Sequence, residues 1–218
     1  MSKHLVVTDS IYNYLLDNSL RETVEIQELR EISSRMPESK MVSAPEATQF
    51  ITWLLKLIKA ERVIEVGVYT GVTSLAIAQS LDPLYLLAMD SNKEWTKVAR
   101  KAWKGAGVDH KIDLRIGLAQ DLLDEQLANG QGGTFDAVFI DANKDGYMDY
   151  YERCFDLIRP GGILIFDNAL MSGKVANQIH KELGVRVMRE VLKKLHRDLR
   201  MDTSLIPVAD GLALGIKR

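Results

Sequence analysis

The stretch that decides the fold reads AVFID over residues 137–141, and a second stretch of the same kind reads ILIFDN over residues 163–168. Each is an apolar, strand-like run that stops at hard oxygen ligands: Asp141 in the first and Asp167-Asn168 in the second. If the runs are neighbouring parallel strands, their carboxyl ends lie about 5 Å apart. The three side chains would then converge on one divalent cation. The alternative is that all three are ordinary turn residues at strand ends.

Two further observations concern this predicted metal site. Lys144 follows Asp141 by three residues and is a candidate base beside the metal, the alternative being a solvated surface charge. Cys154 is the only cysteine, and His4, His110, His180 and His196 show no ligand-like spacing with it. We therefore expect oxygen ligands, and not a zinc site.

Outward from these two runs, apolar strands alternate with helical patterns. Strands are predicted at residues 63–66, 84–89, 112–116, 137–140 and 163–166, and helices at 73–79, 93–104, 120–127 and 147–158. This alternation predicts an α/β fold with a doubly wound, mostly parallel sheet. The tail, at residues 204–208 and 212–216, predicts an antiparallel C-terminal hairpin that completes seven strands. Residues 1–60 are expected to form helices preceding the sheet, within a single domain of residues 1–218.

Composition restricts the class of partner. The chain has 218 residues, 46% of them hydrophobic, with 28 Lys and Arg against 30 Asp and Glu and a formal net charge of -2. This balance argues against general affinity for nucleic acid or an anionic membrane and favours a small-molecule partner. There is no apolar run of membrane-spanning length, and the first 16 residues lack the apolar region of a signal peptide. We therefore expect a cytoplasmic protein.

A cofactor site is predicted where the strand at residues 63–66 runs into Gly67 and Gly71. Asp90 ends the next strand, where a carboxylate can accept the hydroxyls of a ribose. The dinucleotide fingerprint G-x-G-x-x-G would need glycine at 69 and 72, where Tyr69 and Val72 stand. Tyr69 hinders close approach of a pyrophosphate, whereas S-adenosylmethionine has no phosphate and its cationic groups favour a carboxylate such as Glu65. The alternative is that the glycines serve only a tight turn and Asp90 only caps a helix.

Five segments together resemble the cation-dependent class I O-methyltransferases, which include caffeoyl-coenzyme A and catechol O-methyltransferases. They read MVS (41–43), EVGVYTG (65–71), FIDANKDGY (139–147), GGILIFDN (161–168) and PVADG (207–211). The resemblance runs from about residue 36 to the C-terminus. It implies a Rossmann-like methyltransferase fold and methyl transfer from S-adenosylmethionine to a hydroxyl of a small phenolic acceptor, a vicinal diol of catechol or caffeoyl type.

The resemblance also implies residue roles. Asp141, Asp167 and Asn168 would hold Mg²⁺, or another divalent cation such as Mn²⁺ or Ca²⁺, and Lys144 would take the proton from the acceptor hydroxyl. The residues that would surround S-adenosylmethionine are Val42, Glu65, Gly67, Val68, Thr73, Asp90, Ala119 and Asn143. Family members are commonly homodimers, so we expect the helices before Met36 to pack across a two-fold interface or over the acceptor pocket.

Some features leave alternatives open. Asn143 stands where plant members of the family usually have Asp, and Met171 stands where they often have Trp, in a loop that helps to define the acceptor pocket. Residues 181–200 carry seven Lys or Arg against three acids, which fits either an anionic acceptor tail such as coenzyme A or a solvated helix face. Trp53, Trp95 and Trp103 are expected in the core. The rival functions are a catalytically silent S-adenosylmethionine-binding regulatory protein and an NAD-dependent oxidoreductase.

Overall fold

The computed structural model describes residues 5–218, and His4 lies outside them. Its centre is one seven-stranded sheet with the order β3-β2-β1-β4-β5-β7-β6. The strands are β1 (Arg62–Val66), β2 (Tyr85–Asp90), β3 (Ile112–Ile116), β4 (Phe135–Ile140), β5 (Ile158–Phe166), β6 (Met201–Ile206) and β7 (Leu212–Lys217). Strands β1 to β5 are parallel, and β7 is antiparallel to both β5 and β6. The predicted sheet is therefore confirmed.

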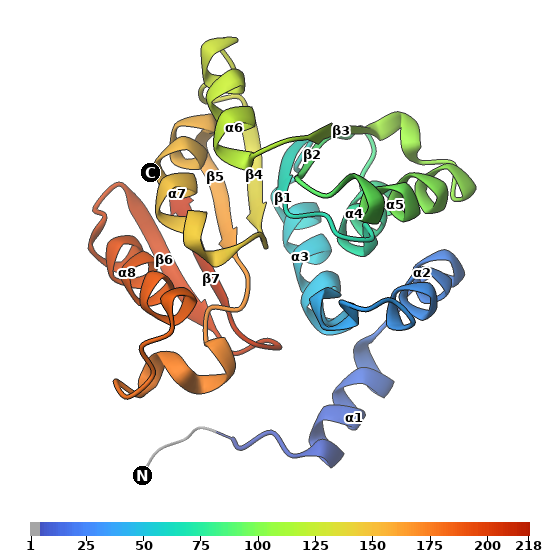
Figure 1. The fold of residues 1–218 in the computed structure, drawn as a ribbon, viewed down its shortest axis with the longest axis horizontal. Helices are drawn as coiled ribbons and strands as arrows, with labels where there is room; N and C mark the ends of the chain where they lie inside the picture. Colours follow the sequence, from blue (N-terminus) through green and yellow to red (C-terminus); the bar gives the residue numbers. More distant parts are fainter. Residues whose placement is uncertain (1–4) are drawn as a thin grey trace.

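Helices cover both faces of this sheet (Figure 1). They are α1 (Asp9–Ser19), α2 (Val24–Ser34), α3 (Pro45–Leu57), α4 (Val72–Ser80), α5 (Lys93–Gly105), α6 (Ala119–Ala128), α7 (Tyr147–Leu157) and α8 (Leu183–Arg197), with short 3-10 turns η1 (Ser39–Met41), η2 (Asp109–Lys111), η3 (Lys144–Gly146) and η4 (Met171–Ala176). In β4, Ala137 and Phe139 pack on the side of α3, whereas Val138 and Ile140 pack on the side of α7. Burial of both faces explains why the central strands are apolar throughout.

Strands β5 and β6 differ most from the sequence prediction. Strand β5 begins at Ile158, so Pro160, Gly161 and Gly162 lie inside it, where a helix end and a turn had been predicted. These residues form an irregularity in the pairing with β4, because proline lacks an N–H and Gly161 has a φ of +76°. Strand β6 begins at Met201 and ends before Pro207, which cannot continue the ladder of hydrogen bonds.

The N-terminal helices differ in how they are held. Helix α2 packs on α4 through Ile26 and Leu29, and Ser33 in α2 hydrogen-bonds Thr70 over 2.7 Å. Helix α1 has no buried side chain and contacts the rest through polar bonds such as Tyr12 to Glu46, 3.0 Å. None of the helices in residues 5–218 combines the length and apolar character needed to cross a membrane.

The three tryptophans do not all lie in the core. Trp103 is 2% exposed and donates to the carbonyl of Gly71 over 3.1 Å, so it supports the loop after β1. Trp53 is 56% exposed, and its prediction as a core residue is wrong. It lies on the outer side of α3, where it stacks on Phe50 with ring centroids 6.0 Å apart.

Candidate active site at the carboxyl ends of the central strands

A cavity of about 1150 Å³ opens at the carboxyl ends of β1, β2, β4 and β5. Every residue to which the resemblance assigned a role in metal binding, base catalysis or cofactor binding lines it, whereas Gly71 does not. They are Val42, Glu65, Gly67, Val68, Thr73, Asp90, Ala119, Asp141, Asn143, Lys144, Asp167 and Asn168. They meet because parallel strands end at the same edge of a sheet. Within the described residues the lining begins at Lys40, so neither α1 nor α2 contributes to it.

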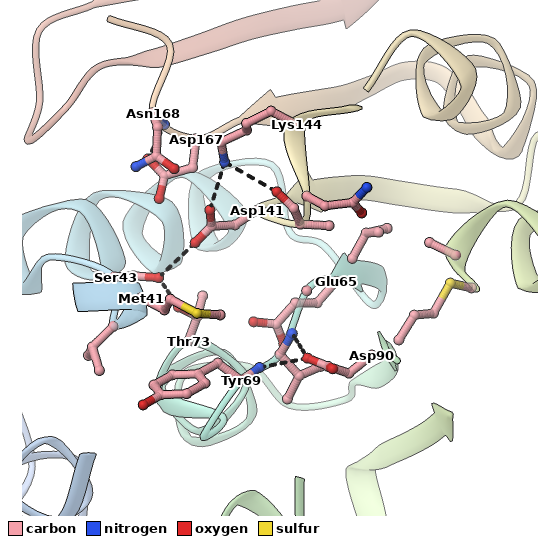
Figure 2. A pocket seen from close by; sticks show the side chains of 18 of the residues that line it. Met41, Ser43, Glu65, Tyr69, Thr73, Asp90, Asp141, Lys144, Asp167 and Asn168 are labelled. Atoms are coloured by element: carbon pink, nitrogen blue, oxygen red, sulfur yellow. Dashed lines mark hydrogen bonds and ion pairs between the residues drawn. The ribbon is translucent and has the colours of Figure 1, made fainter. Parts of the chain in front are cut away.

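The metal end of the cavity is a pair of buried carboxylates. Strands β4 and β5 pair in register up to Ile140 and Phe166, so Asp141 and Asp167 follow at the same level of the sheet. Asp167 is 3% exposed, and burial together with the Asp141 charge raises its pKa to about 7. Burial also raises the pKa of Asp141, against the opposing effect of Lys144. Figure 2 shows Asp141, Asp167 and Asn168 facing one another.

This donor set fits a divalent cation. Two carboxylates are held close together away from water, and Lys144 is the cation that reaches them, with Nζ 3.2 Å from Asp141 Oδ1. A double positive charge would offset the burial that raises both pKa values and the repulsion that Asp141 adds at Asp167. The set combines two carboxylates with the Asn168 carboxamide. Within residues 5–218 no group of three His, Cys, Asp or Glu forms a metal site.

Lys144 is held by several acceptors beside this pair. Its Nζ donates to the Tyr147 hydroxyl over 2.6 Å and to the Ala142 carbonyl over 3.4 Å. Tyr147 is fully buried and donates its own proton to the carbonyl of Ile140 over 3.0 Å. The Tyr147 ring also lies 4.7 Å from Nζ. The ammonium group is therefore fixed at the edge of the carboxylate pair, and a solvated surface charge does not describe it.

Gly67 lets the cofactor end approach the metal end. Its φ is +96°, and a Cβ there would collide with the carbonyl of Asp141 and lie 2.9 Å from the nitrogen of Ala142. Any other residue would force the loop after β1 away from the end of β4. The glycine is therefore required by close backbone approach as well as by the turn.

Asp90 organises the same loop. One carboxylate oxygen accepts the N–H groups of Val68 at 2.9 Å and Tyr69 at 2.8 Å, and the other accepts that of Asn92 at 2.7 Å. Helix α5 is capped by Asn92, so the cap alternative assigned to Asp90 is wrong. Three of the roughly four acceptor sites of the carboxylate are thus used, and the oxygen that accepts from Asn92 retains one for a ribose hydroxyl. Asp90 thus fixes the backbone of the loop after β1 and also faces the cavity.

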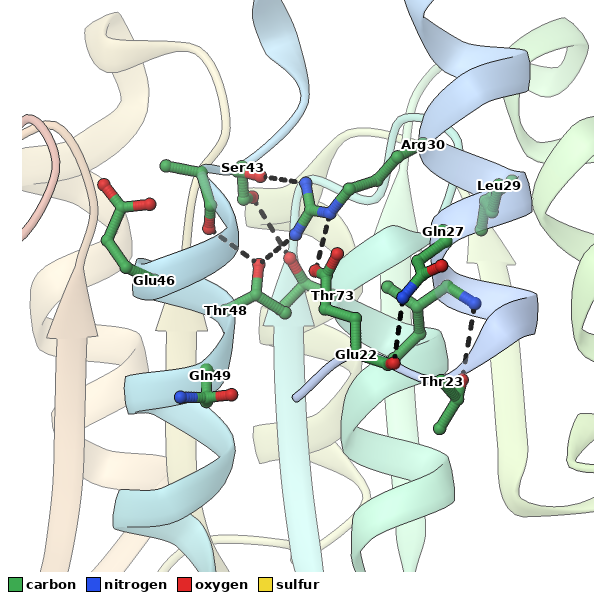
Figure 3. Close-up of polar contacts among 12 residues, drawn as sticks. Glu22, Thr23, Gln27, Leu29, Arg30, Ser43, Glu46, Thr48, Gln49 and Thr73 are labelled. Carbon is green, nitrogen blue, oxygen red and sulfur yellow. Dashed lines mark hydrogen bonds and ion pairs between the residues drawn. The ribbon is translucent and has the colours of Figure 1, made fainter. Parts of the chain in front are cut away.

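Sequence reasoning missed Ser43, which lines the cavity, and Arg30, which holds Ser43 from outside it. Thr73 donates to Ser43 over 3.1 Å, and Ser43 donates to Asp141 over 3.4 Å, so two hydroxyls connect the cofactor end with a predicted metal ligand. Arg30 donates to the Ser43 carbonyl over 2.5 Å and pairs with Glu22 at 2.7 Å (Figure 3). Ser43 had a signal, since it belongs to the MVS segment. No pattern in the sequence indicated a role for Arg30, because its partners Ser43 and Thr48 are brought to it by the fold.

Other cavity residues refine the predictions. Tyr150 donates to the Asn143 side-chain oxygen over 3.0 Å. This bond fixes the orientation of Asn143, the residue that differs from the plant pattern. Trp95 lines the cavity, and its ring makes an edge-on contact with the Tyr69 ring, with ring centroids 5.2 Å apart. The prediction of Trp95 as a core residue is therefore wrong. From the loop after Asn168, Ser172 lines the cavity, whereas Met171 packs against the core.

The basic stretch at residues 181–200 is largely engaged within the protein. Lys193 pairs with Glu190 at 2.9 Å, and Lys194 pairs with Glu152 at 2.5 Å. Arg200 pairs with Asp198 at 2.6 Å. None of the seven basic residues is among those that line the cavity. Where these basic side chains are paired, their partners are acids of α7, of α8 and of the turn after α8, which favours a structural role for them over binding of an anionic tail.

Comparison with known proteins identifies the chemistry of relatives. The family model described as O-methyltransferase matches residues 16–218. Caffeoyl-CoA O-methyltransferase of Petroselinum crispum is 40% identical over 97% of this chain and 92% of its own length. The protein of the same name from Medicago sativa is 38% identical over 97% of this chain and 90% of its own.

Solved structures share the fold. The O-methyltransferase of Bacillus cereus in complex with S-adenosylhomocysteine aligns with a TM-score of 0.87 at 21% identity, covering 96% of this chain and 97% of that one. The O-methyltransferase TomG of Streptomyces achromogenes, solved with S-adenosylmethionine, aligns with a TM-score of 0.86 at 24% identity, covering 95% and 96%. The doubly wound sheet is therefore the Rossmann-like architecture of methyltransferases.

Glu65 generates a testable pH dependence. It is 1% exposed and accepts a hydrogen bond from Ser74, and burial raises its pKa to about 8 from 4.5. A raised carboxyl pKa contributes stability at low pH that is lost as pH rises through the folded-state value. In cofactor-free protein, we expect Glu65→Gln to gain melting temperature relative to the wild type as pH rises from about 5 to about 9.

The matched control is Glu25→Gln, because Glu25 is fully exposed and its pKa is lowered. Its difference from the wild type should stay constant over the same range, as measured by scanning calorimetry. A Glu65→Gln difference that is equally flat would contradict burial of a protonated carboxyl at this position. Asp141 and Asp167 titrate in all three proteins, so only the part of their contribution that depends on the charge of Glu65 remains in the Glu65→Gln difference.

Proposed function

The chain belongs to the O-methyltransferase family and is an S-adenosylmethionine-dependent enzyme, and we propose that it methylates one hydroxyl of a vicinal-diol aromatic acceptor with the help of a divalent cation. The acceptor class is a small phenol of catechol or caffeoyl type, as the names of the relatives suggest. Family membership argues against the NAD-dependent alternative. The catalytically silent alternative is decided by the activity assay below.

The observation that carries this proposal is the buried pair Asp141 and Asp167 beside Asn168. Mg²⁺, Mn²⁺ or Ca²⁺ would be held by these three side chains, since all three ions prefer oxygen ligands. A cation there would supply the positive charge that lowers the pKa of a phenol, which is about 10 in water. Proton transfer and binding of the cofactor are assigned to side chains of the protein.

Lys144 is the candidate general base. Its Nζ lies at the edge of the carboxylate pair, where an acceptor hydroxyl would be within reach of both. Tyr147 holds Nζ in place while keeping its own proton on the Ile140 carbonyl. In this role Lys144 accepts the proton that leaves the acceptor hydroxyl. Tyr147 is therefore assigned a positioning role.

The cofactor end supplies binding and orientation. Glu65 and Asp90 are the carboxylates that face the cavity from β1 and β2, and we assign them to the cationic end and the ribose of S-adenosylmethionine. The other residues assigned to its binding are Val42, Gly67, Val68, Thr73, Ala119 and Asn143. Because Gly67 brings this end against Asp141, a sulfonium methyl and an acceptor oxygen can be held within reacting distance.

A homodimer is part of the proposal. Helix α1 has no buried side chain, and the exposed apolar residues Leu5, Val6, Val7, Tyr14 and Leu15 gather in and just before it. We assign this N-terminal segment to a two-fold contact with a second copy of the chain, since it contributes nothing to the cavity.

The decisive test of function is methyl transfer over a panel of catechols, caffeoyl esters and flavonoids. We expect turnover with Mg²⁺ and its loss in excess EDTA. Asp167→Ala should lower the rate by roughly 10²-fold or more, because the cation loses a ligand. The control Asp149→Ala removes an exposed carboxylate of α7 and should leave turnover unchanged. Full turnover in EDTA would contradict the metal assignment.

Lys144→Met should lower the rate by roughly 10² or more while leaving S-adenosylmethionine affinity nearly unchanged. The loss should shrink at high pH, where hydroxide can take the proton. Lys144→Arg keeps the positive charge beside Asp141 but cannot act as a base near neutral pH, so we expect it to be as slow as Lys144→Met. An active arginine variant would show that Lys144 serves only as a charge.

Removal of residues 1–19 tests the assembly. We expect a dimer for the full chain by light scattering and a monomer, or a much weaker dimer, for the truncated one. The truncated protein should keep its affinity for S-adenosylmethionine, because the cavity lining begins at Lys40. A full chain that is monomeric at all concentrations would contradict the assignment of α1.

A further inference from the structure

The loop of residues 171–182 continues from the predicted metal ligand Asn168 to the start of α8 and contributes Ser172 to the cavity. None of its side chains is fully buried, and only Met171 and Val175 pack partly against the core. Ile179 is 75% exposed. Apolar burial therefore does little to determine the conformation of this loop, and polar contacts must hold it.

The first part of the loop is held by the turn between β6 and β7. The N–H of Ser172 donates to the Asp210 carboxylate over 2.6 Å, and that of Leu170 donates to the Asp210 carbonyl over 2.8 Å. Between these contacts the backbone is strained. Met171, Ser172 and Gly173 have φ values of +49°, +54° and +80°. Two consecutive non-glycine residues persist in this region only when the chain is held on both sides.

The second part of the loop is held by one side chain, Arg189 of α8. Its Nε donates to the carbonyl of Val175 over 2.9 Å, and Nη1 donates to that of His180 over 2.7 Å. Its Nη2 donates to the carbonyls of Lys174 at 2.8 Å and Asn177 at 2.5 Å. Among residues 5–218 no carboxylate forms an ion pair with Arg189, so its charge is directed at these four carbonyls.

We infer that Arg189 is a positioning residue for acceptor recognition, acting through the loop of residues 171–182 on the shape of the cavity beside Asn168. The inference rests on the proposed function, in which the acceptor binds at this end. The planar guanidinium, with donors pointing in several directions, suits four carbonyls of a curved backbone, whereas a lysine ammonium offers donors from a single point. Without this anchor the strained residues 171–173 can relax, and Ser172 and Asn168 lose their fixed relation.

The test compares Arg189→Met and Arg189→Lys with Lys193→Met in the full-length protein. Lys193 lies one turn further along α8 and pairs with exposed Glu190, so its variant controls for loss of a cation from the helix. The acceptor is whichever catechol of the panel the wild type methylates. We expect Arg189→Met to raise the acceptor KM by roughly tenfold or more, with a smaller change in kcat. Arg189→Lys should be intermediate and Lys193→Met unchanged.

Two further measurements separate positioning from general destabilisation. Affinity for S-adenosylhomocysteine, measured by calorimetry, should be unchanged in every variant. Trypsin should cut after Lys174 and Lys181 faster in Arg189→Met than in the wild type or Lys193→Met, because these lysines lie in the released loop. Faster cutting together with a raised acceptor KM and unchanged cofactor affinity supports the inference.

Three outcomes overturn it: wild-type acceptor KM in Arg189→Met, faster cutting without a change in acceptor KM, or acceptor and cofactor affinities that fall together. If Arg189→Met fails to fold, Arg189→Lys carries the same comparison. Failure of the proposed function is distinguishable, because it appears as absence of methyl transfer by the wild type. The rate of cutting by trypsin then still reports whether Arg189 holds the loop, and an unchanged rate would overturn the inference independently.

Discussion

The burial of two carboxylates side by side is the interaction on which the rest of this site depends. Asp141 and Asp167 follow neighbouring parallel strands in register; burial raises the pKa of both, and the Asp141 charge adds to the rise at Asp167. Such a pair is stable only when it shares a proton or is neutralised by positive charge. Lys144 supplies part of it, and the proposed divalent cation supplies the rest, together with the charge that ionises the acceptor. The buried carboxylate pair is therefore unfavourable for the fold without a cation, and in the proposed function it is the feature that binds the cation.

A continuous set of contacts joins this pair to the cofactor end. Gly67 allows the loop after β1 to touch the backbone of Asp141, and the hydroxyls of Thr73 and Ser43 reach its carboxylate. Arg30 fixes the Ser43 backbone from α2, outside the sheet. Two arginines thus have parallel roles: Arg30 holds the segment on one side of the cavity, and we assign Arg189 to the loop on the other. Arg189 donates only to backbone carbonyls, whereas Arg30 donates to one backbone carbonyl, to the Glu22 carboxylate and to the Thr48 hydroxyl, so each arginine helps to fix the path of a segment beside the cavity.

The sequence predicted those features that depend on local pattern. Alternating apolar runs predicted the sheet, and the polar residues at strand ends all line one cavity because the topology requires it. The start of β5 was missed because Pro160 and Gly161 are typical of turns, although here they form an irregular part of a strand. Arg30 and Arg189 were missed because the tertiary fold brings their partners near: a carboxylate, a hydroxyl and a carbonyl for Arg30, and four carbonyls for Arg189. Trp53 was misplaced because helical spacing does not show which side of α3 faces the sheet.

The most direct test of the central claim is a crystal structure with S-adenosylhomocysteine and Mn²⁺, examined by anomalous scattering. The account requires an anomalous peak among the Asp141, Asp167 and Asn168 side chains, on the acceptor side of the bound cofactor. It also requires that the peak disappear in Asp167→Ala while the cofactor remains bound. A peak at another place in the molecule, or a fully ordered cofactor complex with no peak between the two carboxylates, would contradict it.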